Sequence, residues 1–198
     1  MIGKPSKPLI PFFAPFAFAG LLFLGSAPAA IGCGFHSMPE VQLEGMYPGS
    51  LTVAVALRQA ADKGVIDAAA LQSPSKRHAL YIGTVGRLYS FRKAIAASPA
   101  AAELPASFSL GYIESRLWAR FSQSEGKVHV DIHTAGPAKG EAVVLTAEPV
   151  VTELLAGRLS AERAIAEGMI LIDGDESERM AIRHVLDTTS VVPRISSR

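Results

Sequence analysis

Apolar residues recur at helical spacing in the first half of the chain and predict two helices there. Residues 50–64 begin at a capping Ser50, end at Gly64 and carry one apolar stripe of Val53, Ala56, Leu57, Ala60 and Ala61. A second helix opens at Ser73-Pro74 and runs to about Ala97. We interpret residues 50–98 as an α-hairpin. Glycines are unfavourable inside a helix, so Gly83 and Gly86 indicate close packing by a neighbouring element.

From Ser107 the period of the pattern changes to two, as expected for strands with one buried face. One strand is predicted over residues 112–121, where Ile113, Leu117 and Phe121 fall on the same side. Val128, Val130 and Ile132 mark a second strand, and residues 142–145 form a third after the turn GPAKG. We expect these three strands to be adjacent and antiparallel.

Residues 145–175 carry the clearest local signals in the chain. A helix is predicted over 147–156 and ends at Gly157, and a second begins at a capping Ser160 and ends at Gly168. A short strand follows at 169–172, and Asp175 with Glu178 forms a capping box before another helix. The expected fold class is α+β, an antiparallel sheet of four to five strands packed on helices. Residues 50–187 form one domain with a flexible tail at 188–198.

The segment GRLSAERAIAEGMILIDGD (157–175) resembles the carboxyl-terminal half of sterol carrier protein-2-like domains. The resemblance extends more loosely to 107–187, and it implies a non-enzymatic carrier of a lipid or another small apolar molecule. If it carries function, an apolar pocket should lie under the helices and be lined by the inward strand residues Leu117, Val128, Val130, Ile132, Val143 and Leu145. No cofactor is implied.

The amino terminus has the features of an export signal. Lys4 and Lys7 precede an uncharged run at 9–24, which is shorter than the ~20 residues of a spanning helix. Cleavage by an ordinary signal peptidase is possible at Ala27-Pro28-Ala29. Ala30-Ile31-Gly32-Cys33 resembles a bacterial lipobox, with Ala30 replacing the usual Leu, and Cys33 is the only cysteine. We favour removal of 1–32, lipidation of Cys33 and a tether at 33–49. The product would be an exported, periplasmic or membrane-anchored lipoprotein of a bacterial envelope.

Composition narrows the classes of partner. Without residues 1–32 the chain has 17 basic and 18 acidic residues and no basic cluster, which argues against nucleic acid. A single cysteine allows no internal disulfide. The membrane, reached through the lipid anchor, and an apolar small molecule remain as the expected partners.

Candidate chemistry is sparse. The sequence has no nucleophile elbow, phosphate-binding Gly-rich loop or paired-cysteine motif, so catalytic residues are not predicted. Alternation places His129, Asp131 and His133 on one strand face, where they could bind zinc or copper or could simply be solvated. A second possible soft-metal cluster comprises Cys33, His36, Met38 and Met46. Two alternatives to the carrier therefore remain, a periplasmic metal-binding or redox-accessory protein and an interaction module with a filled core.

Overall fold

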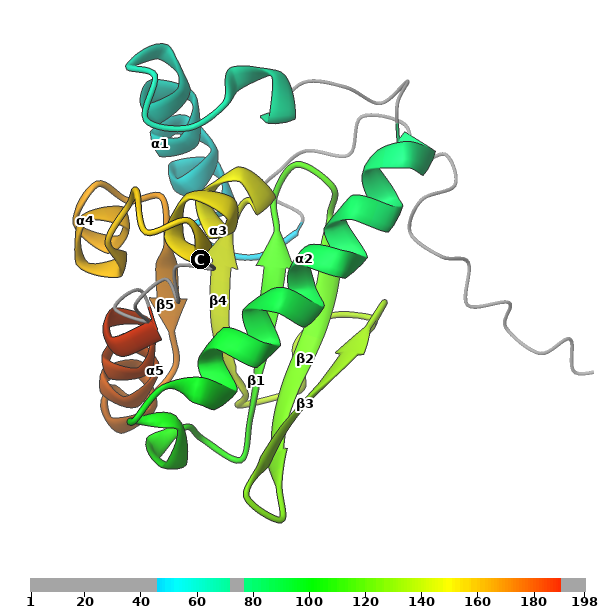
Figure 1. The fold of residues 1–198 in the computed structure, drawn as a ribbon, viewed down its shortest axis with the longest axis vertical. Helices are drawn as coiled ribbons and strands as arrows, with labels where there is room; N and C mark the ends of the chain where they lie inside the picture. The colour runs from blue at the N-terminus through cyan, green and yellow to red at the C-terminus, as the bar shows by residue number, and fades with distance from the viewer. Residues whose placement is uncertain (1–45, 72–76, 190–198) are drawn as a thin grey trace, which may run out of the picture. The chain divides into compact units, whose positions relative to one another are not determined.

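A computed structural model describes residues 46–71 and 77–189 of the 198-residue chain. Five strands form one sheet in the order β3-β2-β1-β4-β5 (Figure 1). Their bounds are β1 Ser107–Tyr112, β2 Leu117–Ser124, β3 Lys127–Ile132, β4 Ala142–Thr146 and β5 Leu171–Asp173. Helices pack on this mostly antiparallel sheet, and the predicted α+β class is confirmed.

Helices cover one face of the sheet and its β5 edge. Their bounds are α1 Ser50–Asp62, η2 Ala68–Leu71, α2 Arg77–Ala97, η3 Ala101–Glu103, α3 Glu148–Leu155, α4 Ala161–Ala166 and α5 Glu176–Thr189, with η marking short 3-10 helices. The long α2 lies across the sheet and contacts β3, α3 and α5, whereas α1 contacts β4 and η2 (Figure 1). Both helices predicted in the first half are thus present. The link between them at 72–76, on which the hairpin interpretation depends, lies outside the described residues.

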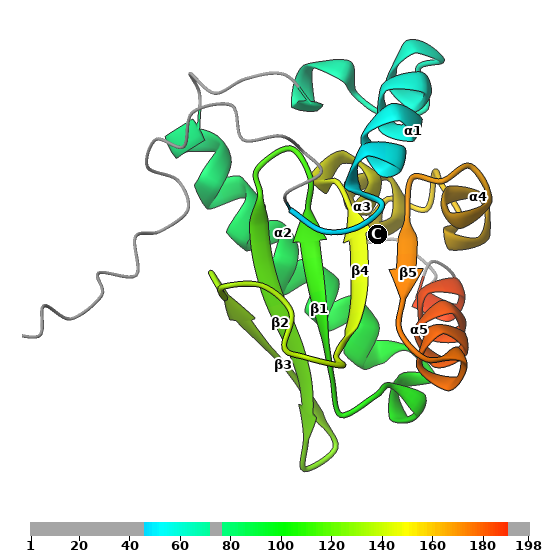
Figure 2. The ribbon, with the colours of Figure 1, turned by 180° about the vertical axis from the view of Figure 1, so that it is seen from behind.

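The prediction of three mutually antiparallel strands is wrong for β4. β4 pairs parallel with β1, with Phe108 opposite Ala142 and Leu110 opposite Val144. The chain leaves β3 at one edge of the sheet. It then crosses the second face of the sheet, opposite α2, as the loop 133–141 and enters β4 on the far side of β1 (Figure 2). Two strands with such a crossover between them can run in the same direction, which a hairpin cannot achieve.

The strand predicted over 112–121 is two strands and a turn. β1 ends at Tyr112, residues 113–116 turn the chain, and Tyr112 pairs with Leu117 at the start of β2. Arg116 has a left-handed backbone with φ of 53°. Ile113 and Leu117 are both buried, so the alternation continues through the turn and conceals it.

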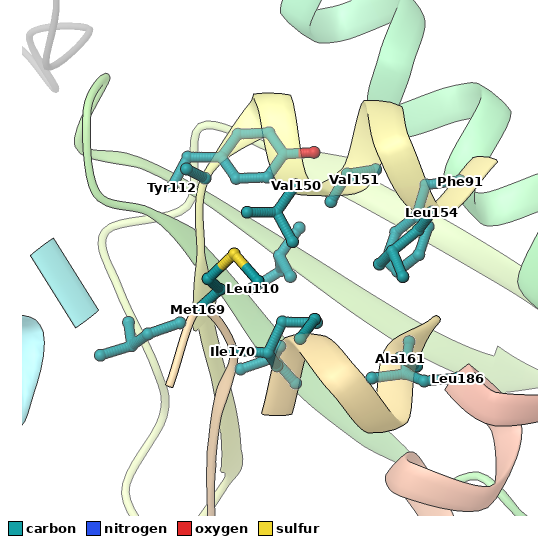
Figure 3. Close-up of a cluster of buried hydrophobic side chains, with 14 of the residues drawn as sticks. Phe91, Leu110, Tyr112, Val150, Val151, Leu154, Ala161, Met169, Ile170 and Leu186 are labelled. Carbon is teal, nitrogen blue, oxygen red and sulfur yellow. The ribbon is translucent and has the colours of Figure 1, made fainter. Parts of the chain in front are cut away.

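The main core lies between the helices and the first face of the sheet. The ring of Phe121 on β2 stacks on Phe108 with centroids 5.0 Å apart and meets Phe91 of α2 edge-on at 5.9 Å. Aliphatic side chains from α3 and from the segment before β5 extend this cluster, among them Val150, Leu154 and Met169 (Figure 3). The packed aromatic layer fixes α2 on the sheet.

The local signals at 157–178 are confirmed, with a small shift of the strand. Ser160 Oγ accepts a hydrogen bond of 3.2 Å from Arg163 N and caps α4. Gly168 has the left-handed φ (75°) expected where a helix stops, as does Gly157. Asp175 accepts from the Glu178 N–H at 2.9 Å, and the reverse bond is 3.4 Å. β5 begins at Leu171 rather than at 169. Met169 and Ile170 precede the strand and are buried in the core.

Gly83 and Gly86 do not mark a close helix contact. An added Cβ at either position would meet no atom of the described residues within 4 Å, and both glycines are exposed on α2. The inference from their helix-breaking tendency is therefore wrong. These glycines leave α2 less stable than alanine would and are not required by packing.

Candidate functional site

The six predicted pocket residues are divided between the two faces of the sheet. Leu117, Val128, Val130 and Ile132 share the face of Phe121, toward α2. Val143 and Leu145 pair with Ser109 and Gly111 and point to the other face, where Leu145 Cδ2 and Trp118 Cζ3 both lie close to Gly111. These six residues therefore cannot line a single pocket.

A pocket lies at the β5 edge of the sheet, between α1, α4, β5 and α5. Its volume is about 430 Å³. Most of its lining is apolar, with polar groups on α1 and α5: Thr52, Val53, Ile165, Gly168, Ile170, Leu171, Ile172, Glu176, Arg179, Met180 and Arg183. None of the six residues predicted from the strands belongs to this lining. The volume falls within the range of ~300–1,000 Å³ typical of small-molecule sites.

One face of α5 forms a wall of this pocket. Glu176, Arg179, Met180 and Arg183 are spaced three and four residues apart, so they form one stripe along the helix. The opposite stripe, Ile182, Val185 and Leu186, is buried in the core and fixes the rotation of the helix. This alternation of buried and charged stripes is visible in the sequence of α5 and is the signal that could have pointed to the site.

A buried polar cluster lies at the carboxyl end of β1, where α3 begins. Glu114 Oε1 accepts a hydrogen bond of 2.7 Å from the backbone N–H of Glu148 and so caps α3. The Glu148 carboxylate in turn accepts 2.5 Å from Thr84 of α2 and lies 3.9 Å from Arg87 Nε. Tyr112, fully buried, feels the charges of both carboxylates. The cluster links β1, α2 and α3.

Burial shifts the pKa values in this cluster. Desolvation raises the pKa of Glu114 to about 7, against the opposing hydrogen bond from Glu148 N–H. Burial also raises the pKa of Tyr112 well above its ordinary value, helped by the charges of Glu114 and Glu148. Glu114 Oε2 has no accessible surface and accepts no hydrogen bond from the described residues. A carboxylate in this position titrates near neutral pH.

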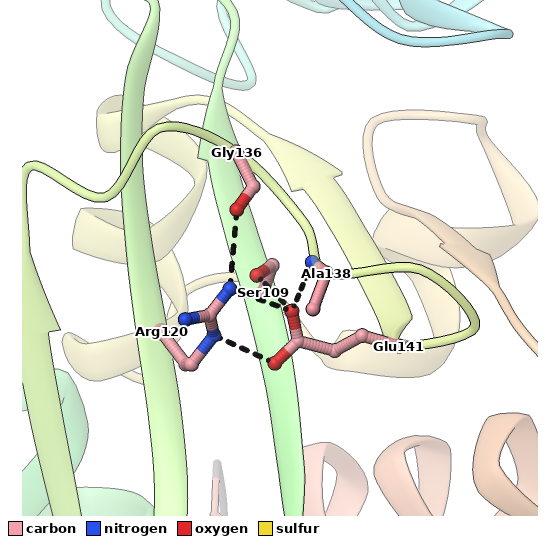
Figure 4. Close-up of polar contacts among 5 residues, drawn as sticks. All are labelled: Ser109, Arg120, Gly136, Ala138 and Glu141. Carbon is pink, nitrogen blue, oxygen red and sulfur yellow. Dashed lines mark hydrogen bonds and ion pairs between the residues drawn. The ribbon is translucent and has the colours of Figure 1, made fainter.

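A second polar network fastens the loop 133–141 to the face of the sheet opposite α2. The carboxylate of Glu141 accepts hydrogen bonds from Ser109 Oγ at 2.8 Å, Arg120 Nε at 2.9 Å and Ala138 N at 2.8 Å (Figure 4). Arg120 also donates to the carbonyl of Gly136 at 3.3 Å. Burial alone would raise the pKa of Glu141, but these hydrogen bonds outweigh it and lower the pKa. Because its carboxylate is fully engaged, we assign the network a structural role.

The structure does not bring His129, Asp131 and His133 together as the metal-binding alternative requires. His129 and Asp131 share one face of β3, but β3 ends at Ile132 and His133 lies beyond it. The left-handed φ of His133, 68°, interrupts the alternation, and its backbone N–H donates to Trp118 O at 3.0 Å. Within 46–71 and 77–189, no three His, Cys, Asp or Glu side chains are placed to hold a metal ion.

The second possible metal cluster and the export signal cannot be followed in the structure. Cys33, His36 and Met38 lie outside the described residues. Met46 is described, and its Cε lies near Gly111 on the second face of the sheet. Among the described helices, none is long and apolar enough to cross a membrane.

Comparison with known proteins gives structural neighbours only. No family model matches the sequence, and no curated protein matches it. A ubiquinone synthesis protein described as UbiJ-SCP2 superposes with a TM-score of 0.40 and 18% identity, over 55% of this chain and 96% of that one. Sterol carrier protein 2 gives a TM-score of 0.38 and 15% identity over the same shares. The neighbours thus include the proteins that the sequence resembles.

A sec-alkylsulfatase from Pseudomonas sp. is also similar, with a TM-score of 0.35 and 15% identity. The match covers 45% of this chain but only 14% of the sulfatase. All these TM-scores lie below 0.5, so the neighbours support no conclusion about activity. The α+β class rests on the strands and helices themselves.

Proposed function

We propose that this protein is a non-enzymatic binding protein for a lipid or another small apolar molecule, and that the pocket between α1, α4, β5 and α5 is the binding site. The observation that carries the proposal is the pocket itself, a space of about 430 Å³ with a mostly apolar lining. Taking apolar ligand surface out of water contributes roughly 25 cal/mol per Å² before the costs of binding. A binding protein needs this volume more than it needs reactive side chains.

The lining offers groups for orientation rather than for catalysis. Its polar members are Thr52, Glu176, Arg179 and Arg183, and these include no histidine or cysteine. The strongly perturbed groups, Glu114 and Tyr112, belong to the separate cluster beneath α2. The lining therefore gives no support to an enzymatic reading.

We also propose, from the sequence alone, that the protein is exported and acylated at Cys33, which would hold the pocket at a membrane surface. The charged start, the short apolar run and the solitary cysteine support this proposal. The expected result is an intact mass for the processed protein that begins at Cys33 and includes attached acyl chains. A mass matching cleavage after Ala29 or Ala30 without added lipid would contradict acylation, and cytoplasmic protein would contradict export.

Blocking the pocket should weaken binding of a neutral apolar probe. Thr52 is exposed on α1 and lines the pocket, so Thr52→Trp should fill the space and weaken binding of N-phenyl-1-naphthylamine at least tenfold. The matched control is Leu51→Trp, since Leu51 is 48% exposed on the same helix but is not part of the lining. Fluorescence titration with the probe measures the binding affinity of each variant. Equal binding by the two variants would show that this pocket is not the site.

A further inference from the structure

We propose that strand β3 pairs with β3 of a second copy of this chain and so forms a symmetric dimer. β3 ends the strand order β3-β2-β1-β4-β5, and no strand of the described chain lies on its outer side. The outward backbone groups of an edge strand are a template for a further strand. The pocket lies at the other edge, so this pairing is independent of ligand binding.

The ladder between β2 and β3 determines which backbone groups point outward. The N–H of His133 donates to the carbonyl of Trp118 at 3.0 Å, and this pair continues the register of the two strands. Because hydrogen-bonded pairs alternate along an antiparallel ladder, the N–H and C=O groups that point away from β2 belong to residues 128, 130 and 132. The carbonyl of Val128 agrees with this direction, since it accepts a hydrogen bond of 3.0 Å from Arg92 of α2.

A register centred on Val130 makes this edge complementary to itself. With Val130 opposite its own copy, Val128 falls opposite Ile132, and all three residues direct their backbone groups toward the second copy. A two-fold axis at Val130 repeats every contact, as in closed homodimers. Val128 O can accept from the second copy and from Arg92 together, because a carbonyl oxygen has two lone pairs.

The side chains also match in this register. The apolar residues of β3 meet one another on the face of α2. On the opposite face, His129 falls opposite Asp131 of the second copy, in a pair whose Cα atoms are about 4.5 Å apart. Both side chains are exposed, and neither has an ion pair among the residues that the structure describes. Arg120, which lies opposite Asp131 on β2, is bound to Glu141 instead.

A register shifted by two residues fits less well. It would pair Lys127 with Asp131, but it would place His129 opposite itself and Ile132 opposite Gly126. Gly126 has a left-handed φ of 71° and belongs to the turn before β3. In the register centred on Val130, every apolar residue of the strand has an apolar partner, and Lys127 falls opposite His133 beyond the strand.

Helix α2 adds apolar surface beside the strand. It contacts β3 on the face that Val130 shares (Figure 1). Arg92 faces β3, and Val85 and Tyr89 lie on the same side of the helix at spacings of four and three residues. Tyr89 is 48% exposed. A specific interface usually buries about 1,200–2,000 Å², so a six-residue strand needs this additional surface.

Exchanging His129 and Asp131 tests the pairing and its register. Native mass spectrometry of the full chain in a mild detergent, over a range of protein concentrations, gives the dissociation constant of the dimer. His129→Asp places two carboxylates opposite each other on both sides of the axis and should raise that constant about tenfold or more. The double variant His129→Asp with Asp131→His should return it to within about threefold of the unchanged protein. Gln59→Asp, exposed on α1, controls for the added charge and should have no effect.

A backbone variant tests the strand pairing itself. Val130→Pro removes an N–H that points away from β2, so the internal ladder is kept, and it should raise the dissociation constant about tenfold or more. Val130→Ala shortens the side chain but keeps the N–H, and it should retain the dimer. If circular dichroism shows Val130→Pro to be unfolded, the exposed charge variants decide.

Three results would overturn the inference. One is an unchanged protein that is monomeric at about 100 μM, a concentration at which even a weak specific dimer is populated. Another is a dimer that persists in His129→Asp. The third is a double variant that dissociates as readily as His129→Asp, which would exclude the register centred on Val130.

Discussion

Replacing Glu114 by Gln is expected to make the protein more stable at about pH 8 and to leave its stability nearly unchanged at about pH 5. Burial raises the pKa of Glu114 from 4.5 in the unfolded chain to about 7 in the folded protein. Between these values the folded state holds a proton that the unfolded state releases, so stability falls as pH rises. Gln stays neutral at every pH and keeps an oxygen that can accept from Glu148 N–H.

The size of the effect follows from the difference between the two pKa values. A rise from 4.5 to about 7 corresponds to a loss of about 3 kcal/mol of unfolding free energy as pH increases through that window. The full contribution of the neutral carboxyl is present below pH 4.5 and is lost above about pH 7. Removal of the charge by Glu114→Gln should therefore recover up to about 3 kcal/mol at alkaline pH.

Urea unfolding of the two proteins across this pH range measures the difference directly. Subtracting one curve from the other cancels the titration of histidines that both proteins share. Glu167→Gln is the control, because Glu167 pairs with Arg163 on the surface, 2.7 Å from its guanidinium. That variant should differ from the unchanged protein by a small amount with little dependence on pH. A Glu114→Gln protein that is less stable than the unchanged protein at pH 8 would contradict the raised pKa.

The sequence predicts those features of this fold that depend on neighbouring residues. Ser160, Gly168 and the pair Asp175–Glu178 act within one helical turn, and the structure places all of them as expected. The parallel pairing of β4 with β1 depends on a crossover between residues more than thirty positions apart along the chain. Hydrophobic period carries no information on that pairing, so the expected meander was wrong at this strand.

The side of the sheet to which a residue points could be predicted only where one face is exposed. β3 alternates between exposed positions and positions that are buried or partly buried, and Val128, Val130 and Ile132 were assigned to the correct face. All five residues of β4 are buried, because both of its faces are covered. A strand without exposed positions shows no alternation, so Val143 and Leu145 were assigned to a face from which they point away.

The candidate pocket could not have been assembled from the sequence. Thr52 on α1 and Arg183 on α5 are more than a hundred residues apart, and both line the same space. The sequence contains the pattern of each helix but not their meeting at β5. It did indicate an apolar ligand through a family resemblance, and the structure supplies a pocket in a different place from the one that the resemblance implied.

Replacing Gly111 by Ala is expected to destabilise the protein by about 1–3 kcal/mol, whereas the same change at Gly86 should stabilise it by about 1 kcal/mol. A Cβ on Gly111 would lie 2.8 Å from Trp118 Cζ3 and 2.9 Å from Leu145 Cδ2, closer than carbon atoms approach without displacement. The Cε of Met46, 3.0 Å away, ends a flexible side chain and can move.

Trp118 and Leu145 have less freedom. Leu145 is fully buried, and the Trp118 ring meets Tyr47 edge-on with centroids 6.2 Å apart. The Tyr47 hydroxyl donates a hydrogen bond of 2.8 Å to Asp173 of β5. Moving the indole of Trp118 would therefore disturb the position of Tyr47 as well. At Gly86 the added methyl meets no atom within 4 Å in the part of the chain that the structure describes, so the gain in helix propensity decides the effect. Urea denaturation measures the change in unfolding free energy for Gly111→Ala and for Gly86→Ala. Equal shifts at the two positions would show that Gly111 is not required by close packing against Trp118 and Leu145.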